Sequence, residues 1–311
     1  MGKFLVLHAS DLHLAEIPDR AGFPGWLHVL RGLPTPLASH GSVHPYALAQ
    51  FVFNQKPHLV LLSGDIATSG AAANLLVASE FIDSKPSATF TNANKRPTVA
   101  TARRVVIPGN HDRFHGHVPY LPNNPAFDRT FPRHWRGSSR VKTLEFLTDR
   151  ADSTHLAVIG ADFSLRRITD ATDPRFGYLG QGRVDDPTLR ALQAETRRVR
   201  RKYKAVAILW VVHFAPQFPK LARYLKLIDG GKLLSAAKAM RVSYILSGHT
   251  HAASDYLPVP GVEVLCAGTA MEYGSLSQCI HMREFNVSPK TGAVSHSQKQ
   301  YNWDVTARQY L

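Results

Sequence analysis

The sequence predicts an α/β protein, because short apolar strands alternate with amphipathic helices along the chain. Strands are expected at 3–11, 58–65 and 103–112, and helices between them at 45–55 and 74–83. The C-terminal part is rich in strand patterns and has few helical ones. This order is typical of a layered protein in which helices cover a sheet.

The second half of the chain continues the alternation. Further strands are expected at 154–162, 205–216, 243–251 and 262–270. Antiparallel strands at 279–287 and 293–301 are expected to join through the turn 288–292. Two helices are expected, one after Asp185 and Asp186 as N-cap and N1 residues, followed by Pro187, and one at 231–240.

Composition places the chain among ordinary globular proteins. It has 311 residues, of which 44% are hydrophobic and 19% charged, and residues 1–311 are expected to form a single domain. No apolar run reaches the roughly 20 residues that a membrane span needs. Cys266 and Cys279 are too few for a disulfide framework, so we expect a soluble cytoplasmic protein with reduced thiols.

The formal charge of +14 favours an anionic partner. A phosphorylated substrate, a nucleic acid and a lipid headgroup all fit, and a basic surface without a specific partner fits equally well. The basic loop at about 113–143 is long for a compact domain, as is the segment 15–44, and such loops are usually functional or disordered. Basic and aromatic residues alternate at 129–142, and a second basic run at 197–204 closes a predicted helix.

Five of the expected strands end on residue types that bind metal ions. Because ligand sites in open α/β sheets form at the carboxyl ends of strands, these ends are expected to meet. The motifs are, in chain order, Asp11-Leu12-His13, Gly64-Asp65, Gly109-Asn110-His111-Asp112, His213 and Gly248-His249-Thr250-His251.

Carboxylates and imidazoles together suit Mn, Fe, Zn or Ni, and none of the candidate residues is a cysteine. One carboxylate can bridge two ions, and two ions can clamp the attacking and leaving oxygens of a phosphoryl displacement. Glycine before Asp65, Asn110 and His249 lets the backbone turn sharply and approach closely. Each motif alone is also found in ordinary turns, but the ordered set of five predicts a metal centre.

The set resembles the calcineurin-like metallophosphoesterase family, whose pattern is DxH, GD, GNH(D/E), a single H and GHxH. The resemblance runs from about residue 3 to residue 285. It implies a four-layer α/β/β/α sandwich, in which two mixed sheets are flanked by helices and a dinuclear metal site lies at the strand ends.

The resemblance also implies a role for each matched residue. One group would bind the first ion: Asp11, His13 and His251. A second group would bind the other ion: Asn110, His213 and His249. Asp65 would bridge both ions. His111 would lie over the phosphate and assist the leaving group, and Asp112 would orient it.

The function expected from these residues is metal-dependent hydrolysis of a small phosphodiester or nucleotide derivative by a hydroxide held between two ions. Members that act on cyclic nucleotides are similar, although many carry an acidic or amide residue two or three positions after GD, where this chain has Ala67 and Thr68. A nuclease is the main alternative. A non-catalytic scaffold is a third, and the intact ligand set with His111 argues against it.

Overall fold

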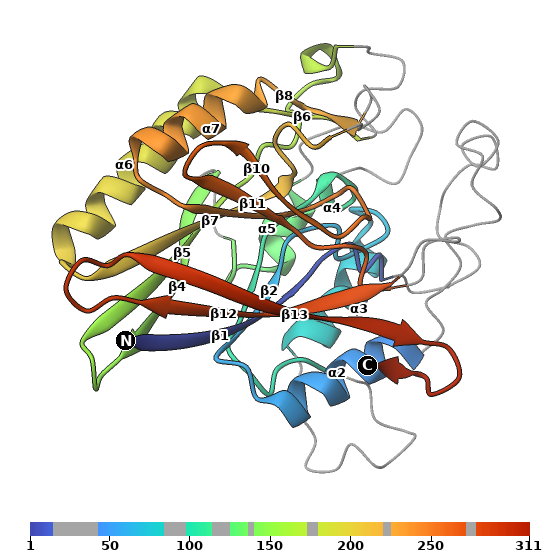
Figure 1. Ribbon diagram of the computed structural model, residues 1–311. Coiled ribbons are helices and arrows are strands. Elements are labelled where there is room, and N and C mark those ends of the chain that lie inside the picture. The colour runs from blue at the N-terminus through green and yellow to red at the C-terminus, as the bar shows by residue number, and fades with distance from the viewer. Residues whose placement is uncertain are drawn as a thin grey trace.

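The computed structural model describes residues 1–14, 43–83, 98–113, 125–135, 140–172, 180–219, 225–271 and 278–311. Two large sheets face each other in this part of the chain, and helices cover their outer faces (Figure 1). The predicted four-layer α/β/β/α sandwich is therefore confirmed. The segment 15–42 and parts of the loop at 113–143 lie outside the described residues, and the single domain stays a prediction.

The first sheet is mixed, with the order β14-β13-β12-β1-β2-β3. Strands β1, β2 and β3 run parallel, with β3 at the edge, and β12 pairs antiparallel with β1. Its strands are β1 (Gly2–Ala9), β2 (Leu59–Leu62), β3 (Arg104–Val106), β12 (Cys279–Val287), β13 (Val294–Asp304) and β14 (Gln309–Tyr310).

The second sheet is also mixed, with the order β10-β11-β9-β7-β5-β4. Strands β5, β7, β9 and β11 are parallel, and β4 and β10 are antiparallel edge strands. Its strands are β4 (Val141–Asp149), β5 (Thr154–Ala161), β7 (Val206–Phe214), β9 (Tyr244–Gly248), β10 (Ser254–Val259) and β11 (Val262–Cys266). A two-stranded sheet pairs β6 (Gly182–Arg183) with β8 (Leu227–Ile228).

Helices lie on both outer faces. Figure 1 shows α2 and α3 beside the first sheet and α6 and α7 across the second. The helices are α2 (Val43–Gln55), α3 (Ala72–Asp83), α4 (Asn110–Arg113), α5 (Ala126–Thr130), α6 (Asp186–Lys202) and α7 (Gly230–Ala239). The side chain of Asp185 accepts from the backbone N–H of Thr188, which confirms the expected N-cap of α6. No helix in the described ranges has the length and apolar character that a membrane crossing would require.

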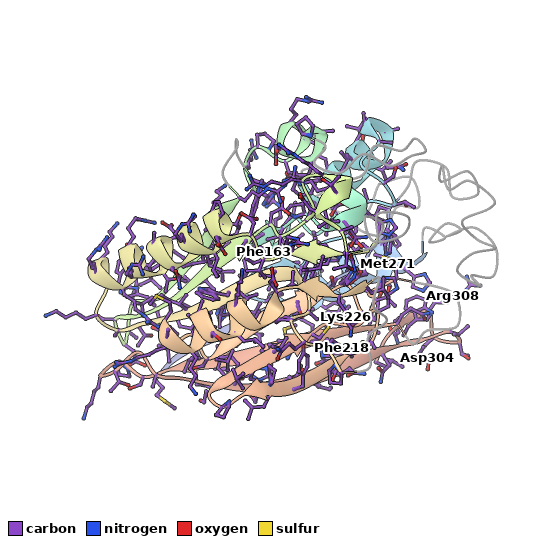
Figure 2. All side chains as sticks on the ribbon, turned by 90° about the horizontal axis from the view of Figure 1, so that it is seen from above. Phe163, Phe218, Lys226, Met271, Asp304 and Arg308 are labelled. Carbon is purple, nitrogen blue, oxygen red and sulfur yellow. The ribbon has the colours of Figure 1, made fainter. Side chains whose placement is uncertain are left out.

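Strand β7 divides the apolar interior into two cores. All of its residues are buried, and side chains of a strand alternate between its faces. Leu209 belongs to the core between the two sheets, whereas Trp210 packs under α6 and donates to the Thr196 hydroxyl (2.9 Å). Figure 2 shows Phe163 within the body of the protein and Arg308 at its margin.

The structure differs from the expected elements in the basic loop and near its start. Strand β3 ends at Val106, and Asn110–Arg113 forms a short helical turn where continued strand was expected. Helix α5 and the start of β4 lie inside the segment 113–143 that was expected to be a loop. Phe127 and Phe131 of this segment are fully buried, and their tertiary contacts order a helix too short to show a period in the sequence.

A fully buried guanidinium lies between the sheets. Arg283 of β12 pairs with Asp255 of β10 through two contacts of 3.0 and 3.1 Å. Its Nε donates to Nδ1 of His8 (3.2 Å), and Nε2 of His8 lies 2.9 Å from the Ser63 hydroxyl at the end of β2. Burial, with the charge of Arg283, lowers the pKa of His8, so this ring is neutral. The network therefore joins both sheets near the strand ends.

Replacing Arg283 with Met is expected to lower the free energy of unfolding by about 3 kcal/mol, because Asp255 loses its cation in a poorly solvated place. Chemical denaturation measures the change. The matched control is Arg198→Met, which removes an exposed ion pair with Glu195 and should cost less than about 1 kcal/mol. Equal losses in the two variants would contradict a special role for the buried pair.

Candidate metal centre

The polar residues at the strand ends come together at one edge of the two sheets. Asp11 follows β1, Asp65 follows β2, and Asn110 follows β3 in the first sheet. His213 lies near the end of β7, and His249 follows β9 in the second. The expected meeting of the five strand ends is therefore observed, and both sheets contribute.

Backbone hydrogen bonds hold the first two loops side by side beyond their strands. The N–H of Asp11 donates to the carbonyl of Gly64 (3.0 Å), and the N–H of His13 donates to the carbonyl of Asp65 (3.0 Å). The buried hydroxyl of Thr68 donates to the carbonyl of His13 (2.6 Å). These bonds extend the parallel pairing of β1 and β2, so Asp11 and His13 are held beside Asp65.

The centre contains backbone strain. Non-glycine residues rarely adopt a positive φ, although Asp and His tolerate it better than most. Five of the candidate metal ligands do so, with φ between +49° and +71°: Asp11, His13, Asp65, His249 and His251. Strain of this kind costs of order 1–3 kcal/mol per residue and tends to gather at functional sites.

Glycine is required where the loops approach most closely. A Cβ atom on Gly109 would lie 2.2 Å from Oδ1 of Asp65 and 2.5 Å from its backbone nitrogen. A Cβ atom on Gly64, whose φ is +106°, would lie 2.3 Å from Nδ1 of His213. The glycines of the GD and GN motifs therefore allow the carboxylate and the imidazole to reach the centre.

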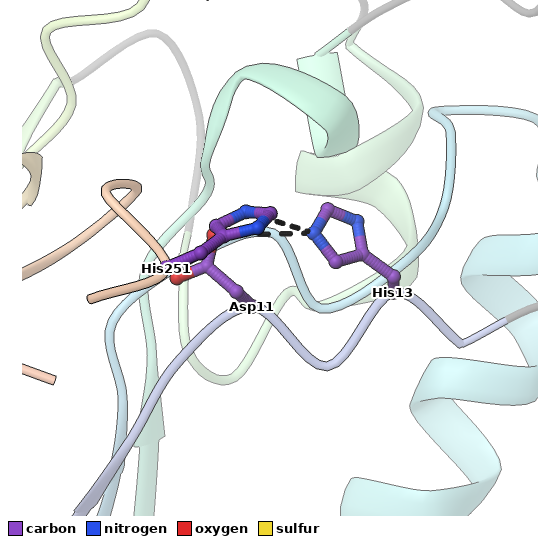
Figure 3. Close-up of side chains that lie close together, drawn as sticks. All are labelled: Asp11, His13 and His251. Atoms are coloured by element: carbon purple, nitrogen blue, oxygen red, sulfur yellow. Dashed lines mark hydrogen bonds and ion pairs between the residues drawn. The ribbon is translucent and has the colours of Figure 1, made fainter. Parts of the chain in front are cut away.

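One group of possible ligands consists of Asp11, His13 and His251, whose ligand atoms lie within 4.8 Å of one another (Figure 3). Oδ1 of Asp11 is 3.1 Å from Nε2 of His251, and the two Nε2 atoms of the histidines are 3.5 Å apart. Among the described residues, Oδ1 of Asp11 is a buried oxygen that accepts no hydrogen bond. A cation between these three side chains would satisfy it.

A second group consists of Asp65, His213 and His249, also within 4.8 Å. His213 donates from Nδ1 to the carbonyl of Ser63 (2.8 Å), so its Nε2 faces Oδ2 of Asp65 and Oδ1 of Asn110, each 3.1 Å away. His249 donates from Nε2 to the carbonyl of Leu225 (2.9 Å), which leaves Nδ1 as its electron-pair donor. Donor atoms therefore converge here, as in metal sites whose histidines are oriented by carbonyl groups.

The electrostatics favour a cation. Burial alone would raise the pKa of Asp65, but His213 and His111 lower it, so the carboxylate is ionised. Burial alone would lower the pKa of His213, yet Asp65 and Asp11 raise it to about 9. Burial, with the neighbouring His213, lowers the pKa of His249 to about 3. Two buried carboxylates thus attract positive charge, while His249 stays in the neutral form that binds metal ions.

The resemblance implied that Asp112 orients His111, but in the structure the ring of His111 binds the carbonyl of Thr68. Nδ1 of His111 donates to the carbonyl of Thr68 (2.8 Å), and its Nε2 lies 4.0 Å from Oδ2 of Asp65. The carboxylate of Asp112 forms no hydrogen bond with this ring in the described part of the chain. Its carboxylate instead accepts from the backbone N–H groups of Ile66, Ala67 and Gly109, at 2.9 to 3.2 Å. The prediction that Asp112 orients His111 is therefore wrong, because these N–H groups occupy the carboxylate.

Asp112 joins the loop that carries Asp65 to the loop that carries Asn110. Burial, together with the charge of Asp65, raises the pKa of Asp112 to about 7, although three backbone hydrogen bonds favour the ionised form. Sequence reasoning missed the roles of Asp112 and Thr68 as supports. The Thr68 hydroxyl, the Thr68 carbonyl and the Asp112 carboxylate act through tertiary contacts, and such contacts leave no pattern in the sequence.

The aromatic residues of the basic loop are part of the core. Phe131 and Trp135 are at most 1% exposed, and His134 is buried against Asp83 (3.1 Å). These three rings are therefore not available for stacking on bases. Arg129 and Arg133 are exposed, and Arg136 lies outside the described residues.

Other cations of this region hold the fold together. Arg140 donates to the carbonyls of Asp162 and Ser164, and Lys142 donates to the carbonyls of Arg133 and His134. These hydrogen bonds engage Arg140 and Lys142, two cations of the 129–142 segment that were candidates for binding phosphate.

Comparison with known proteins agrees with the observed fold and with a metal centre formed by the Asp and His residues described above. A family model described as calcineurin-like phosphoesterase matches residues 4–253, so the chain belongs to that family. It is accordingly a metal-dependent phosphoric ester hydrolase. No curated protein matches the sequence significantly.

Solved structures with little sequence identity share the fold. A dimetal phosphatase from Danio rerio is 13% identical, with a TM-score of 0.61, over 95% of this chain and 98% of that one. A Staphylococcus aureus protein with a proposed 5′-nucleotidase activity is 15% identical, with a TM-score of 0.52, over 96% of this chain. The Haemophilus influenzae NAD nucleotidase is 13% identical, with a TM-score of 0.50, over 97% of this chain. This chain spans only 54% and 50% of the last two proteins.

Replacing Gly109 with Ala is expected to displace Asp65 and to reduce activity by about 10²-fold, because misplacement by an ångström is costly in an active site. Metal content and hydrolysis of a chromogenic phosphoester are the measurements. In the control Gly231→Ala, the nearest atom to the new Cβ is Nε2 of Gln217 at 3.2 Å, so activity should be retained. Full activity in Gly109→Ala would show that the close approach is not needed.

Proposed function

We propose that this hydrolase cleaves a small phosphodiester or nucleotide derivative at the strand-end centre. The observation that carries the proposal is the convergence of two ligand clusters, one around Asp11 and the other around Asp65, at a single edge. The structural similarity to two nucleotidases supports a nucleotide-like substrate.

Each cluster would hold one ion. We assign the first ion to Asp11, His13 and His251 and the second to Asn110, His213 and His249, with Asp65 between them, as the family resemblance implies. The donor atoms suit Mn²⁺, Fe²⁺ or Fe³⁺, Zn²⁺ or Ni²⁺. When bound, such ions supply Lewis acidity and lower the pKa of water near the substrate.

His111 would manage the proton of the leaving group. Because its Nδ1 donates to the carbonyl of Thr68, its Nε2 is the atom directed toward the centre. A proton on Nε2 can be donated to a departing alkoxide, and a positioned acid of this kind contributes about 10²–10⁴-fold. Distance alone also groups His111 with His13 and Asp65, so a ligand role is the competing assignment.

A small substrate is favoured over a polynucleotide. Proteins that bind single-stranded nucleic acid without sequence preference combine exposed aromatic rings with a basic groove. Phe131 and Trp135, the aromatic candidates of the basic loop, are buried instead. The nuclease remains the second candidate because Arg129 and Arg133 are exposed there. A cytoplasmic location stays a prediction from the sequence.

A substrate panel with Mn²⁺ tests the proposal. Bis-p-nitrophenyl phosphate, p-nitrophenyl phosphate, cyclic nucleotides, and single-stranded DNA and RNA are compared by kcat/KM. The diester and nucleotide substrates are expected to be cleaved faster than the monoester and the polynucleotides. Faster cleavage of single-stranded DNA or RNA, with a steep dependence on salt, would favour the nuclease.

Replacing Asp65 with Asn is expected to lower the content of both ions, because one carboxylate faces both clusters. Elemental analysis of purified protein measures the loss, and activity should fall with it. Asp152→Asn is the control, since Asp152 lies in the β4–β5 turn at the other end of the sheet. Unchanged metal content and activity in Asp65→Asn would exclude the bridging assignment.

Replacing His111 with Ala is expected to leave the metal content unchanged and to lower kcat by about 10²–10⁴-fold on substrates with poor leaving groups. p-Nitrophenolate departs without a proton, so its esters should lose less activity than esters of a ribose hydroxyl. The comparison variant is His249→Ala, which should lose metal. If His111→Ala lost as much metal as His249→Ala, His111 would be a ligand.

A further inference from the structure

A cleft of about 460 Å³ lies at the edge of the second sheet opposite the metal centre. The end of α6, the start of β7, the segment between α7 and β9, and the β12–β13 turn line it. The end of α6 and the β12–β13 turn lie on the left side of Figure 1. Val206 lines the cleft, and His213 follows seven residues along the same strand, which corresponds to roughly 23 Å at about 3.3 Å per residue. The cleft is therefore separate from the candidate centre.

The walls of the cleft are strongly basic. Arg200, Lys204 and Arg241 line it, and no carboxylate is among the described lining residues. The side chains of Lys204 and Arg241 form no hydrogen bond or ion pair within the described part of the chain. Burial, together with the charge of Arg241, lowers the pKa of Arg200, as expected for two guanidinium groups that lack an anion between them.

A structural role explains only part of this charge. Arg200 donates to the carbonyl oxygens of Met240 and Arg241, just beyond the end of α7, where a cation complements the helix dipole. Lys204 and Arg241 come from different segments and face the same cavity without such partners. Like charges gathered around a cavity repel one another, and a bound anion would relieve that repulsion.

We propose that this cleft binds a phosphorylated small molecule of about the size of a nucleotide. The volume falls in the range of about 300–1,000 Å³ that is typical of ligand pockets. Guanidinium groups and an ammonium group suit phosphate oxygens, and Tyr203 and Ser243 also line the cleft. Binding here would not require metal ions, so the site is independent of the proposed hydrolysis.

Calorimetry with inorganic pyrophosphate and with ADP tests the proposal on the full chain at low salt. EDTA is present, because pyrophosphate chelates metal ions and because the metal-free centre, with its two carboxylates, repels anions. Wild-type protein is expected to bind both probes. The double variant Lys204→Gln/Arg241→Gln should bind at least about tenfold more weakly, since one charge-assisted hydrogen bond is worth about that factor.

The control variant Arg197→Gln/Arg201→Gln removes the same charge from exposed positions of α6 that do not line the cleft. It should bind the probes within about twofold of the wild type. Equal weakening in both double variants would mean diffuse attraction to a basic surface and would overturn the proposal. Absence of binding to the wild type at low salt would also overturn it.

The single variants Lys204→Gln and Arg241→Gln keep the test decisive if the double variant unfolds. Both side chains lack partners among the described residues, so each single variant should keep the wild-type melting temperature. Each is expected to show a partial loss of affinity. Wild-type affinity in both single variants would exclude these two cations as ligands for the probes.

Discussion

The position of the Asp65 carboxylate is the constraint on which the centre depends. Its Oδ1 accepts from the backbone N–H of His111 (2.8 Å), and its Oδ2 lies 3.1 Å from Nε2 of His213. One side chain thus connects the ends of β2, β3 and β7, which belong to both sheets. The two sheets must pack at a fixed offset for these contacts to form, so the centre depends on the packing of the whole sandwich.

Holding that carboxylate in place costs backbone strain, and the surrounding hydrogen bonds compensate for it. Asp65 adopts a φ of +50°, and Asp11 and His13 adopt similar values. Asp112 accepts from three backbone N–H groups of the adjoining loops, and Thr68 bonds across to the loop of His13. Rigid loops of this kind keep ligand atoms at fixed separations, which a metal-dependent hydrolase requires.

The basic character of the chain has several separate causes. Arg113 and Arg140 bind the buried carboxylate of Asp162, and Arg113 also binds Asp128 of α5, which stabilises the segment around that helix. Arg200 binds carbonyl groups beyond the end of α7. The net charge of +14 therefore does not describe one surface, and the candidate metal centre itself contains the two buried carboxylates Asp11 and Asp65. The net charge adds these groups together, whereas the binding of a ligand depends on the local charge around its own site.

The fold class and the residues that cluster could be predicted from the amino-acid sequence alone. Apolar strands that end in Asp, Asn and His predict a site at a sheet edge, because strand direction places those ends together. The contacts that support the site could not be predicted, because they form only when distant segments pack together. Asp112 binds backbone N–H groups, and the Thr68 carbonyl orients His111. Asp112 directly follows His111 in the sequence and Thr68 is three positions after Asp65, yet neither position by itself reveals these contacts. Phe131 and Trp135 belong to the core for the same reason: burial depends on what packs against a side chain, and spacing along the chain does not encode it.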